Sequence, residues 1–284
     1  MNLMVLGTVQ DGGFPQAGCF QKCCKSISST QKRLISSISV INKETNDCWI
    51  IDITPDFKDQ IKLIEDFLSI DCLPNIKGVF LTHAHVGHYL GLLDLGTKIM
   101  DMSNIPIYAM PRMKSFLENN APFNFLIESE NIIINNIDNN EMINLSDQVS
   151  LSPFLVPHRN ELSETVGYNI KSNSKSIIYI PDIDAWNLWN DNILEVVKEN
   201  DLLFLDGTFY DSNELPNRDI SNIPHPFISD SLKMFSELNC FDKEKIFFTH
   251  LNHSNPLLNK DSFEFKSLID NGFKVLNEKN FFPI

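Results

Sequence analysis

Three histidines stand within six residues, directly after a short apolar run, and this cluster restricts the fold more than any other feature of the sequence. They are His83, His85 and His88, and the run before them is Gly78–Leu81. Such a run is typical of a buried strand. Two side chains in H-x-H spacing on an extended segment point to the same side. The cluster therefore predicts imidazoles that converge at one strand end.

Two further histidines also follow runs that predict strands. His158 ends the run Val149–Pro157, and His250 ends the run Lys245–Thr249. A strand end is rigid and opens onto a loop, so side chains from distant parts of the chain can meet there. A single histidine in such a place is more often a packing or surface residue. Neutral imidazole is a common zinc ligand and also suits iron, so this larger arrangement indicates a metal site.

Short apolar runs alternate with segments of helical periodicity along most of the chain. The predicted strands are Leu3–Leu6, Ser37–Ile41, Trp49–Ile53, Gly78–Thr82, Ile105–Ala109, Val149–Val156, Thr165–Ile170, Ser176–Ile180, Leu202–Leu205 and Lys245–Thr249. The predicted helices are Pro55–Ser69, Gly87–Asp101, Arg112–Asn119, Ala185–Lys198, Pro226–Leu238 and Asp261–Asn271. The polar stretch Asn131–Glu141 is predicted to be a surface loop. We therefore expect one α/β domain over residues 1–284, with two packed mixed β-sheets and helices on the outer faces.

Charge and hydropathy narrow the partners. The 284 residues include 37 acidic and 23 basic ones, which give a net charge of −14. Long nucleic acid needs clustered Lys and Arg, so we expect a small-molecule substrate, with a homodimer as the assembly to be tested. No apolar stretch reaches the roughly 18 residues that span a bilayer, so no membrane partner is expected. The N-terminus reads as a strand and not as a signal peptide, and we expect a cytoplasmic protein with reduced cysteines.

The histidine cluster, His83-x-His85-x-Gly87-His88, resembles the H-x-H-x-D-H motif of the metallo-β-lactamase superfamily. Further residues follow in the chain order of that family, namely Asp52, His158, Asp182 and His250. The resemblance covers nearly the whole chain. It implies an αββα sandwich that binds one or two divalent metal ions, zinc in the first place and iron or manganese as alternatives.

The same resemblance implies a role for each residue. The first ion would be held by His83, His85 and His158. The second would be held by His88 and His250. Asp182 would bridge the two ions, and Asp52 would have a structural role before the first helix.

One position departs from the family motif. Gly87 stands where the family has an aspartate that normally binds the second ion, and glycine has no side chain to do so. We therefore expect weak or absent binding at the second site, with waters beside the two histidines and the shared carboxylate. The protein would then be mononuclear, altered in its chemistry or inactive.

A second pair of residues bears on the reaction. Asp206 and His225 resemble, by their surroundings and order, the acid and histidine pair of tRNase Z-type phosphodiesterases. A histidine held by a carboxylate can protonate a leaving oxygen, as hydrolysis of a phosphodiester requires. Alternatively, His225 packs at a helix entry and Asp206 caps a loop.

Three cysteines follow a glycine-rich loop near the N-terminus. Residues 7–19, with Cys19, Cys23 and Cys24, resemble the PqqB family and also PhnP, in which such a cluster is taken as a structural zinc site. The resemblance implies an additional zinc ion in a Cys-rich element at residues 12–30. The alternative is three reduced, partly buried thiols. His253 is a fourth ligand, a liner of the active site or a hydrogen-bonding loop residue.

These observations leave three functions open. The first is a metal-dependent hydrolase that acts on a small phosphodiester or related ester through metal-activated water. The second is a PqqB-like, iron-dependent oxygenase or hydroxylase in cofactor biosynthesis, since an imidazole-rich site with open positions also suits ferrous iron. The third is a non-catalytic binding protein that retains the fold.

Overall fold

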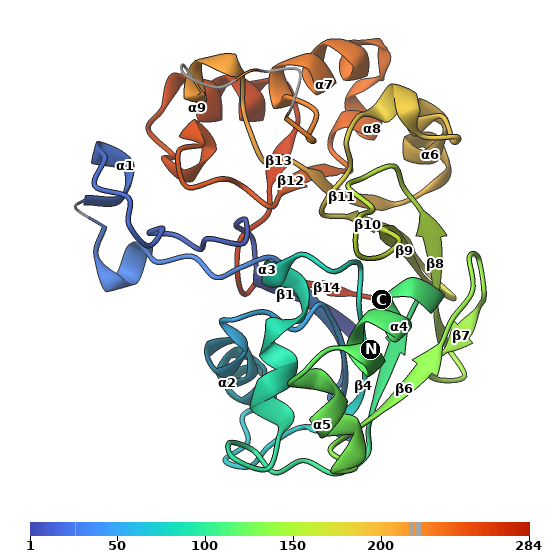
Figure 1. Ribbon diagram of the computed structural model, residues 1–284. Helices are drawn as coiled ribbons and strands as arrows, with labels where there is room; N and C mark the ends of the chain where they lie inside the picture. The colour runs from blue at the N-terminus through green and yellow to red at the C-terminus, as the bar shows by residue number, and fades with distance from the viewer. Residues whose placement is uncertain (26, 216–218, 220–222) are drawn as a thin grey trace.

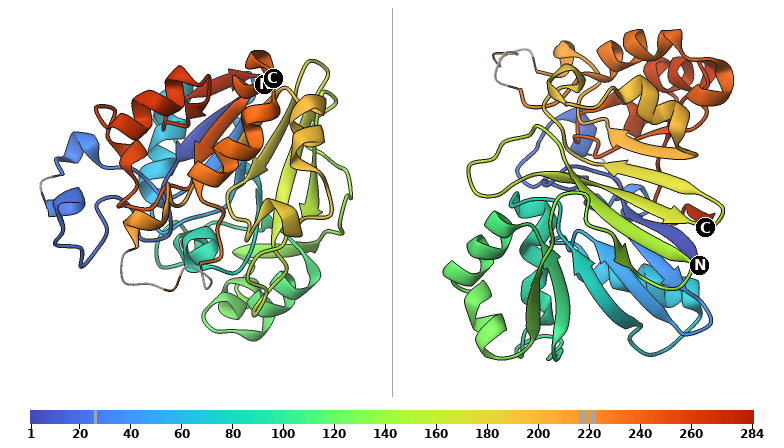
Figure 2. Two further views of the ribbon diagram at one scale, coloured as in Figure 1. Left: turned by 90° about the horizontal axis from the view of Figure 1, so that it is seen from above. Right: turned by 90° about the vertical axis from the view of Figure 1, so that its right-hand side faces the viewer.

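In the computed structural model, the chain forms two β-sheets packed face to face with helices on both outer faces (Figure 1). The structure describes residues 1–25, 27–215, 219 and 223–284. Figure 2 shows the same layers from two further sides. The αββα sandwich predicted from the sequence is confirmed.

The first sheet has seven strands. In spatial order they are β14 (Phe281–Pro283), β1 (Asn2–Gly7), β2 (Ser37–Asn42), β3 (Asp47–Ile51), β4 (Asn75–Phe80), β5 (Ile105–Ala109) and β6 (Ile132–Asn136). The pairs β1 with β2 and β2 with β3 are antiparallel, whereas β3 to β6 run parallel. Strand β14 pairs with β1, so the two ends of the chain lie close together (Figure 2).

The second sheet also has seven strands. In spatial order they are β13 (Lys274–Val275), β12 (Ile246–Thr249), β11 (Leu202–Asp206), β10 (Ser176–Ile180), β9 (Val166–Ser172), β8 (Val149–Leu155) and β7 (Ile143–Asn144). Strands β10 to β13 are parallel, and β7 to β10 pair antiparallel. Both sheets are therefore mixed.

Most helices cover the outer faces of the sheets, whereas α1 lies on a segment that extends away from them. The helices are α1 (Lys22–Lys25), α2 (Phe57–Leu68), α3 (Val86–Tyr89), α4 (Pro111–Asn119), α5 (Phe123–Glu128), α6 (Ile193–Glu199), α7 (Ile228–Met234), α8 (Cys240–Lys243) and α9 (Phe263–Asp270). Helix α2 shows why they pack there, because its buried residues Phe57, Ile61 and Ile64 recur at helical spacing and join the core beneath the first sheet. No helix within the described residues is long and apolar enough to cross a membrane.

Strands in the middle of the sheets, such as β1, are apolar on both faces because both faces are covered. In β1, Leu3 and Val5 point into the core between the sheets, whereas Met4 and Leu6 point toward the helices. This alternation follows from the two-residue period of a strand. It explains why the strand sequences show continuous apolar runs.

Three predictions of secondary structure were wrong. Strand β6 lies inside the stretch 131–141 that was predicted as a loop, because its three successive isoleucines are β-branched and pair with β5. The predicted helix Gly87–Asp101 is the short α3 followed by a 3₁₀ turn, Leu90–Leu95. The predicted helix Ala185–Lys198 becomes α-helical only at Ile193, after the 3₁₀ turn Trp186–Leu188.

The strand directions place six strand ends at the same end of the sandwich. Strands β1 and β4 run in one direction in the first sheet, and β8, β10, β11 and β12 share a direction in the second. The loops that follow these strands carry the candidate site residues. Between β1 and β2 the chain extends away from the sandwich and carries α1 (Figure 1). The Cys-rich element predicted at 12–30 falls there, apart from residue 26, which is outside the described residues.

Candidate metal centre

Four of the predicted ligands form one cluster. They are His83, His85, His158 and Asp182, which follow β4, β8 and β10. His85 Nδ1 lies 2.8 Å from His83 Nε2 and 3.4 Å from His158 Nε2. His158 Nε2 is 3.6 Å from Asp182 Oδ1. Ligand atoms about 2 Å from a tetrahedral zinc ion lie roughly 3.3 Å apart, so this spacing suits an ion.

The other two predicted ligands face the second oxygen of the same aspartate. His88 Nε2 lies 3.2 Å and His250 Nε2 3.3 Å from Asp182 Oδ2. Asp182 therefore presents one carboxylate oxygen to each cluster, as a bridging ligand must. The structure brings all six predicted residues into one site.

Three buried polar atoms of this site have no hydrogen bond within the described part of the chain. His88 Nε2, His250 Nε2 and Asp182 Oδ2 are buried, and none of them has a hydrogen bond to any residue that the structure describes. Leaving such a group unpaired costs about 1–3 kcal/mol. A cation bound between them would satisfy all three, so the residues present fit a divalent metal ion.

The site residues are oriented by a buried network behind them. Asp52 Oδ2 accepts a hydrogen bond of 2.7 Å from His88 Nδ1. Thr82 Oγ1 donates to Asp52 at 2.9 Å and accepts from His83 Nδ1 at 3.0 Å. Each bond leaves Nε2 of the histidine facing the centre. Asp52 has a left-handed backbone with φ of 65°, a strained conformation that is common at functional sites.

A similar network of hydrogen bonds orients the site histidines that follow strands of the second sheet. Thr208 Oγ1 donates to Asp206 Oδ1 at 2.8 Å and accepts from His250 Nδ1 at 2.9 Å. His158 Nδ1 donates to Asp184 Oδ1 at 3.0 Å. His250, like Asp52, has a left-handed backbone, with φ of 58°. In both sheets, hydrogen bonds at Nδ1 thus fix the ring orientation of these histidines.

We expect the substitution Asp52→Asn to weaken metal binding at the second site about 10–100-fold. The Asp52 carboxylate has two accepting oxygens, whereas the amide of asparagine has only one. The variant would therefore lose acceptor capacity toward His88 and Thr82, and the His88 ring would lose its fixed orientation. Zinc affinity measured by competition with a chromophoric chelator tests this. The exposed Asp138→Asn variant is the control, and equal affinities for all three proteins would contradict the orienting role.

The protonation states of His85 and Asp182 favour the binding of a cation. Burial is the main influence on His85 and lowers its pKa to about 4, so its nitrogen lone pair is available near neutral pH. Burial acts to raise the pKa of Asp182, but the neighbouring His250 and His88 outweigh it and hold that pKa well below its usual range. Asp182 is therefore a charged carboxylate.

His225 and Asp206 lie beside the centre and contact each other. His225 Nδ1 donates to Asp206 Oδ2 at 2.8 Å and lies 4.0 Å from Asp182 Oδ1. The same Asp206 oxygen accepts from the backbone of Ile183 at 3.0 Å. Burial acts to lower the pKa of His225, but the charge and hydrogen bond of Asp206 raise it above the ordinary value. The structure thus brings together the pair that the sequence predicted.

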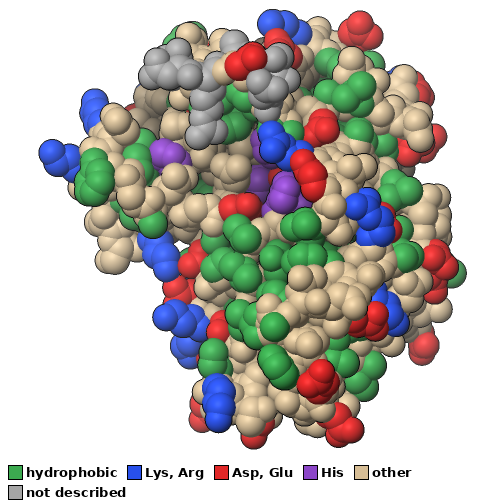
Figure 3. Space-filling view, in the orientation of Figure 1, with side chains coloured by type: hydrophobic (Ala, Val, Ile, Leu, Met, Phe, Trp, Pro, Cys, Tyr) green, Lys and Arg blue, Asp and Glu red, His purple; other side chains and the backbone are tan. Residues whose placement is uncertain are grey.

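These residues open onto a pocket of about 500 Å³. Its lining consists of Gln10, Asp11, His85, Arg159, Asp182, Phe209, Asp219, Ile223, Pro224, His225 and His250. Figure 3 shows histidine side chains in a hollow near the middle of one face, with basic and acidic side chains at its edge. The charged lining residues Asp11, Arg159 and Asp219 were not predicted as site residues from the sequence. Asp11 had a signal that could have been used, since it follows the predicted strand Leu3–Leu6 near its C-terminal end.

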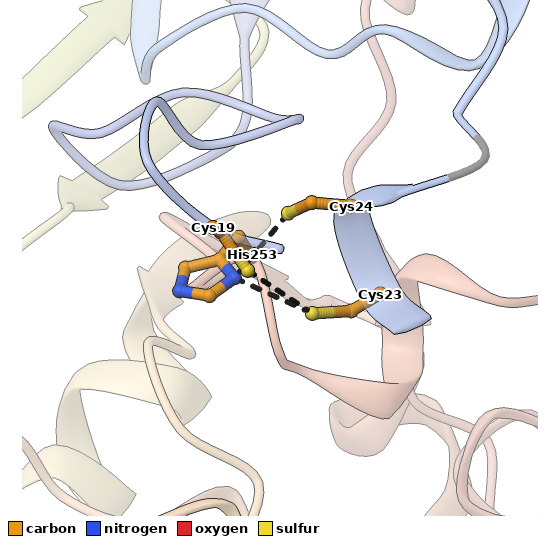
Figure 4. Close-up of side chains that lie close together, drawn as sticks. All are labelled: Cys19, Cys23, Cys24 and His253. Carbon is orange, nitrogen blue, oxygen red and sulfur yellow. Dashed lines mark hydrogen bonds between the residues drawn. The ribbon is translucent and has the colours of Figure 1, made fainter. Parts of the chain in front are cut away.

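The three N-terminal cysteines form a separate cluster with His253. All four side chains point toward one another (Figure 4). Cys19 Sγ and Cys23 Sγ are 3.8 Å apart, and His253 Nδ1 lies 3.5 Å from the sulfurs of Cys23 and Cys24. Thiolates about 2.3 Å from a tetrahedral zinc ion lie roughly 3.8 Å apart, so the set fits zinc.

The thiols of this cluster differ in their pKa. Burial, together with the adjacent thiols, raises the pKa of Cys23 to about 12, whereas a backbone hydrogen bond at Gln21 lowers the pKa of Cys19. A bound metal ion would allow the thiols to deprotonate together. Burial lowers the pKa of His253, which leaves its ring neutral. Of the three roles considered for His253, its position favours the fourth ligand.

Comparison with known proteins supports the same interpretation. The sequence profile described as "Beta-lactamase superfamily domain" matches residues 49–251. "Coenzyme PQQ synthesis protein B" of Acinetobacter baumannii is 24% identical in a 303-residue alignment that covers 97% of each chain. The zinc-bound PqqB structure from Methylobacterium extorquens superimposes with a TM-score of 0.81 at 22% identity, over 100% of both chains. A diphosphatase from the PhnP family gives a TM-score of 0.71 at 23% identity, over 99% of this chain and 96% of the other.

The profile covers well over half of the chain and includes four strand ends that carry the candidate ligands. The PqqB relatives match nearly the full length, as the sequence motifs predicted. The chain therefore belongs to the β-lactamase superfamily, has the metallo-β-lactamase fold and falls on its PqqB-like branch.

Proposed function

We propose that this chain is a metal-dependent hydrolase that cleaves a small phosphodiester or a related ester. The observation that carries the proposal is the contact between His225 and Asp206 beside the metal centre. His225 uses Nδ1 to bind Asp206, so its Nε2 is left to act on a substrate. The similarity to a diphosphatase supports a phosphate ester as the substrate class.

Divalent ions in this centre would supply an activated water and positive charge for the phosphoryl oxygens. His225 would give the leaving oxygen a proton from Nε2. Asp206 would hold the ring in place and stabilise its charged form. Arg159 is the only Lys or Arg among the described residues that line the pocket, and its guanidinium suits a phosphate oxygen.

The pocket also limits the size of the substrate. Its volume of about 500 Å³ is in the range of small-molecule sites. The net charge of −14 disfavours a polyanion as substrate. Both observations support a small ester over a long nucleic acid.

The substitution His225→Ala tests the proposal through the leaving group. With a diphenyl phosphate substrate, whose leaving group needs a proton, we expect the rate to fall about 10²–10⁴-fold. With bis-p-nitrophenyl phosphate the loss should be much smaller, because nitrophenolate departs without protonation. The Asp206→Asn variant should show the same trend with a smaller loss. Equal rates of wild type and His225→Ala on both substrates would remove His225 from the mechanism.

A second candidate is a PqqB-like oxygenation in cofactor synthesis. The observation that favours it is the similarity to a coenzyme PQQ synthesis protein along 97% of this chain. An imidazole-rich site with one bridging carboxylate also suits ferrous iron. Metal analysis after anaerobic purification separates the two functions. Stoichiometric iron with substrate-dependent oxygen uptake would support oxygenation and overturn the hydrolase proposal.

A further inference from the structure

The second cluster of the metal centre contains a carboxylate outside the family motif. We propose that Asp11 binds the second metal ion in place of the aspartate that the family carries at the position of Gly87. The inference rests on the metal centre of the proposed function and assigns a ligand within it. The second site then has a full set of four ligands: Asp11, His88, Asp182 and His250.

The distances fit one ion. Asp11 Oδ1 lies 3.4 Å from His88 Nε2 and 3.9 Å from His250 Nε2. These atoms belong to one group that could hold a metal ion, and both nitrogens also face Asp182. Ligand atoms around a tetrahedral ion with bonds of about 2 Å are roughly 3.3 Å apart, so a modest contraction would close the site on zinc.

The unpaired atoms converge on the same point. Asp11 Oδ1 is buried and has no hydrogen bond to the residues that the structure describes, and the same is true of His88 Nε2, His250 Nε2 and Asp182 Oδ2. Burying a charged oxygen without a partner costs free energy, and proteins normally avoid it. Two carboxylate oxygens and two imidazole nitrogens that face one another unpaired are what a bound cation requires.

The missing side chain at position 87 makes room for Asp11. A Cβ placed on Gly87 would overlap the Asp11 carboxylate, because it would lie 2.7 Å from the carboxyl carbon and 2.8 Å from the Asp11 Cα. A side chain at 87 and the present position of Asp11 therefore exclude each other. The carboxylate of Asp11 occupies the space next to His88 that a residue at 87 would enter.

The backbone holds Asp11 against the segment that carries His250. Leu251 donates its N–H to the Thr8 carbonyl at 2.9 Å, and Gln10 donates to the Leu251 carbonyl at 3.0 Å. Gly13 donates to the Gln10 carbonyl at 2.8 Å and closes a turn that needs its positive φ of 68°. Asp11 is thus positioned by the fold and not by a mobile loop.

Zinc titration against a chromophoric chelator tests the inference without any turnover. Wild type is expected to take up three ions per chain, one in the cysteine cluster and two in the centre. Asp11→Asn should keep two of them, while the affinity for the third falls at least about tenfold, because the neutral amide is a poorer ligand than the carboxylate. Retention of two ions shows that the variant is folded.

A control variant and a second readout sharpen the result. Asp138→Asn removes the same charge from an exposed residue outside the metal-binding groups, and it should leave all three affinities unchanged. Cobalt-loaded wild type should show the EPR signature of a coupled pair, which Asp11→Asn should lack.

The outcomes separate this inference from the proposed function. Wild-type affinity for the third ion in Asp11→Asn, or uptake of a single ion by the wild-type centre, would overturn the role of Asp11. Loss of the third ion in Asp11→Asn supports that role even where no phosphodiester is hydrolysed, in which case only the proposed function fails.

Discussion

The substitution Asp182→Ala is expected to lower metal-dependent turnover at least about 10³-fold and to release metal from the centre. Asp182 presents Oδ1 to the His158 side and Oδ2 to His88 and His250, so its loss would remove a ligand from both clusters at once. A metal ion contributes several kcal/mol of charge stabilisation in the transition state, and about 4 kcal/mol corresponds to roughly 10³-fold in rate. Rate and zinc content should fall together.

The exposed Asp191→Ala variant is the matched control for Asp182→Ala, since it removes the same side chain from a position outside the metal-binding groups. Far-UV circular dichroism should show that both variants are folded. Full metal content and rate in Asp182→Ala would contradict the bridging role. Undiminished cellular function together with loss of metal would instead favour the third interpretation, a binding protein that retains the fold.

Local spacing made most of the metal centre predictable. The positions of His83, His85 and His88 relative to one another are fixed by a strand end and the turn that follows it, so their convergence is encoded in a few residues. His250 was predictable because parallel strands end at a common edge of a sheet. His158 was predictable because it follows a strand run, and two antiparallel pairings give β8 the same direction as β10. These features depend on the positions and the order of the strands, and both can be read from the apolar runs in the sequence.

The remaining ligands depend on contacts between distant segments. Asp11 approaches His88 only because β1 and β4 end at the same edge of the first sheet and Gly87 leaves room for a carboxylate. His253 Nδ1 meets Cys23 Sγ across 230 positions of sequence. Asp11 follows a predicted strand, as other ligands do, but its place alone does not distinguish a ligand from a loop residue, and the same is true of His253. The expectation of an incomplete second site therefore followed from the motif.

The fold was predictable to the level of its layers but not of every element. Continuous apolar runs identified the buried strands, whereas β6 was concealed by the Asn residues around its three isoleucines. The periodicity of residues 87–101 predicted one helix, but a 3₁₀ turn follows the short α3. Gly91 packs against Ile53 there, and the Ile53 carbonyl accepts a hydrogen bond from the Gly91 N–H at 3.0 Å. Tertiary packing, which periodicity does not report, decided that turn.

The substitution Cys24→Ser is expected to weaken zinc binding in the cysteine cluster at least about 100-fold, because loss of residues that only orient ligands already costs 10–100-fold. The segment around it has little else to hold it. Phe14 and Cys24 are buried, but Phe20 is 87% exposed, and α1 has only four residues. We therefore expect limited proteolysis to cut Cys24→Ser within residues 12–30, as it should cut wild type after chelation.

Two cysteines outside the cluster provide controls for this prediction. Cys240 and Cys72 are exposed free thiols outside the cluster, so Cys240→Ser and Cys72→Ser should keep wild-type zinc content and resist cleavage. The αββα sandwich should survive in Cys24→Ser, because its three apolar cores are built mainly from strands and helices outside this segment. Wild-type zinc content in Cys24→Ser would contradict a thiolate site. Loss of zinc without cleavage would show that backbone pairing alone holds the segment, as the Leu251 bonds to Thr8 and Gln10 do at its start.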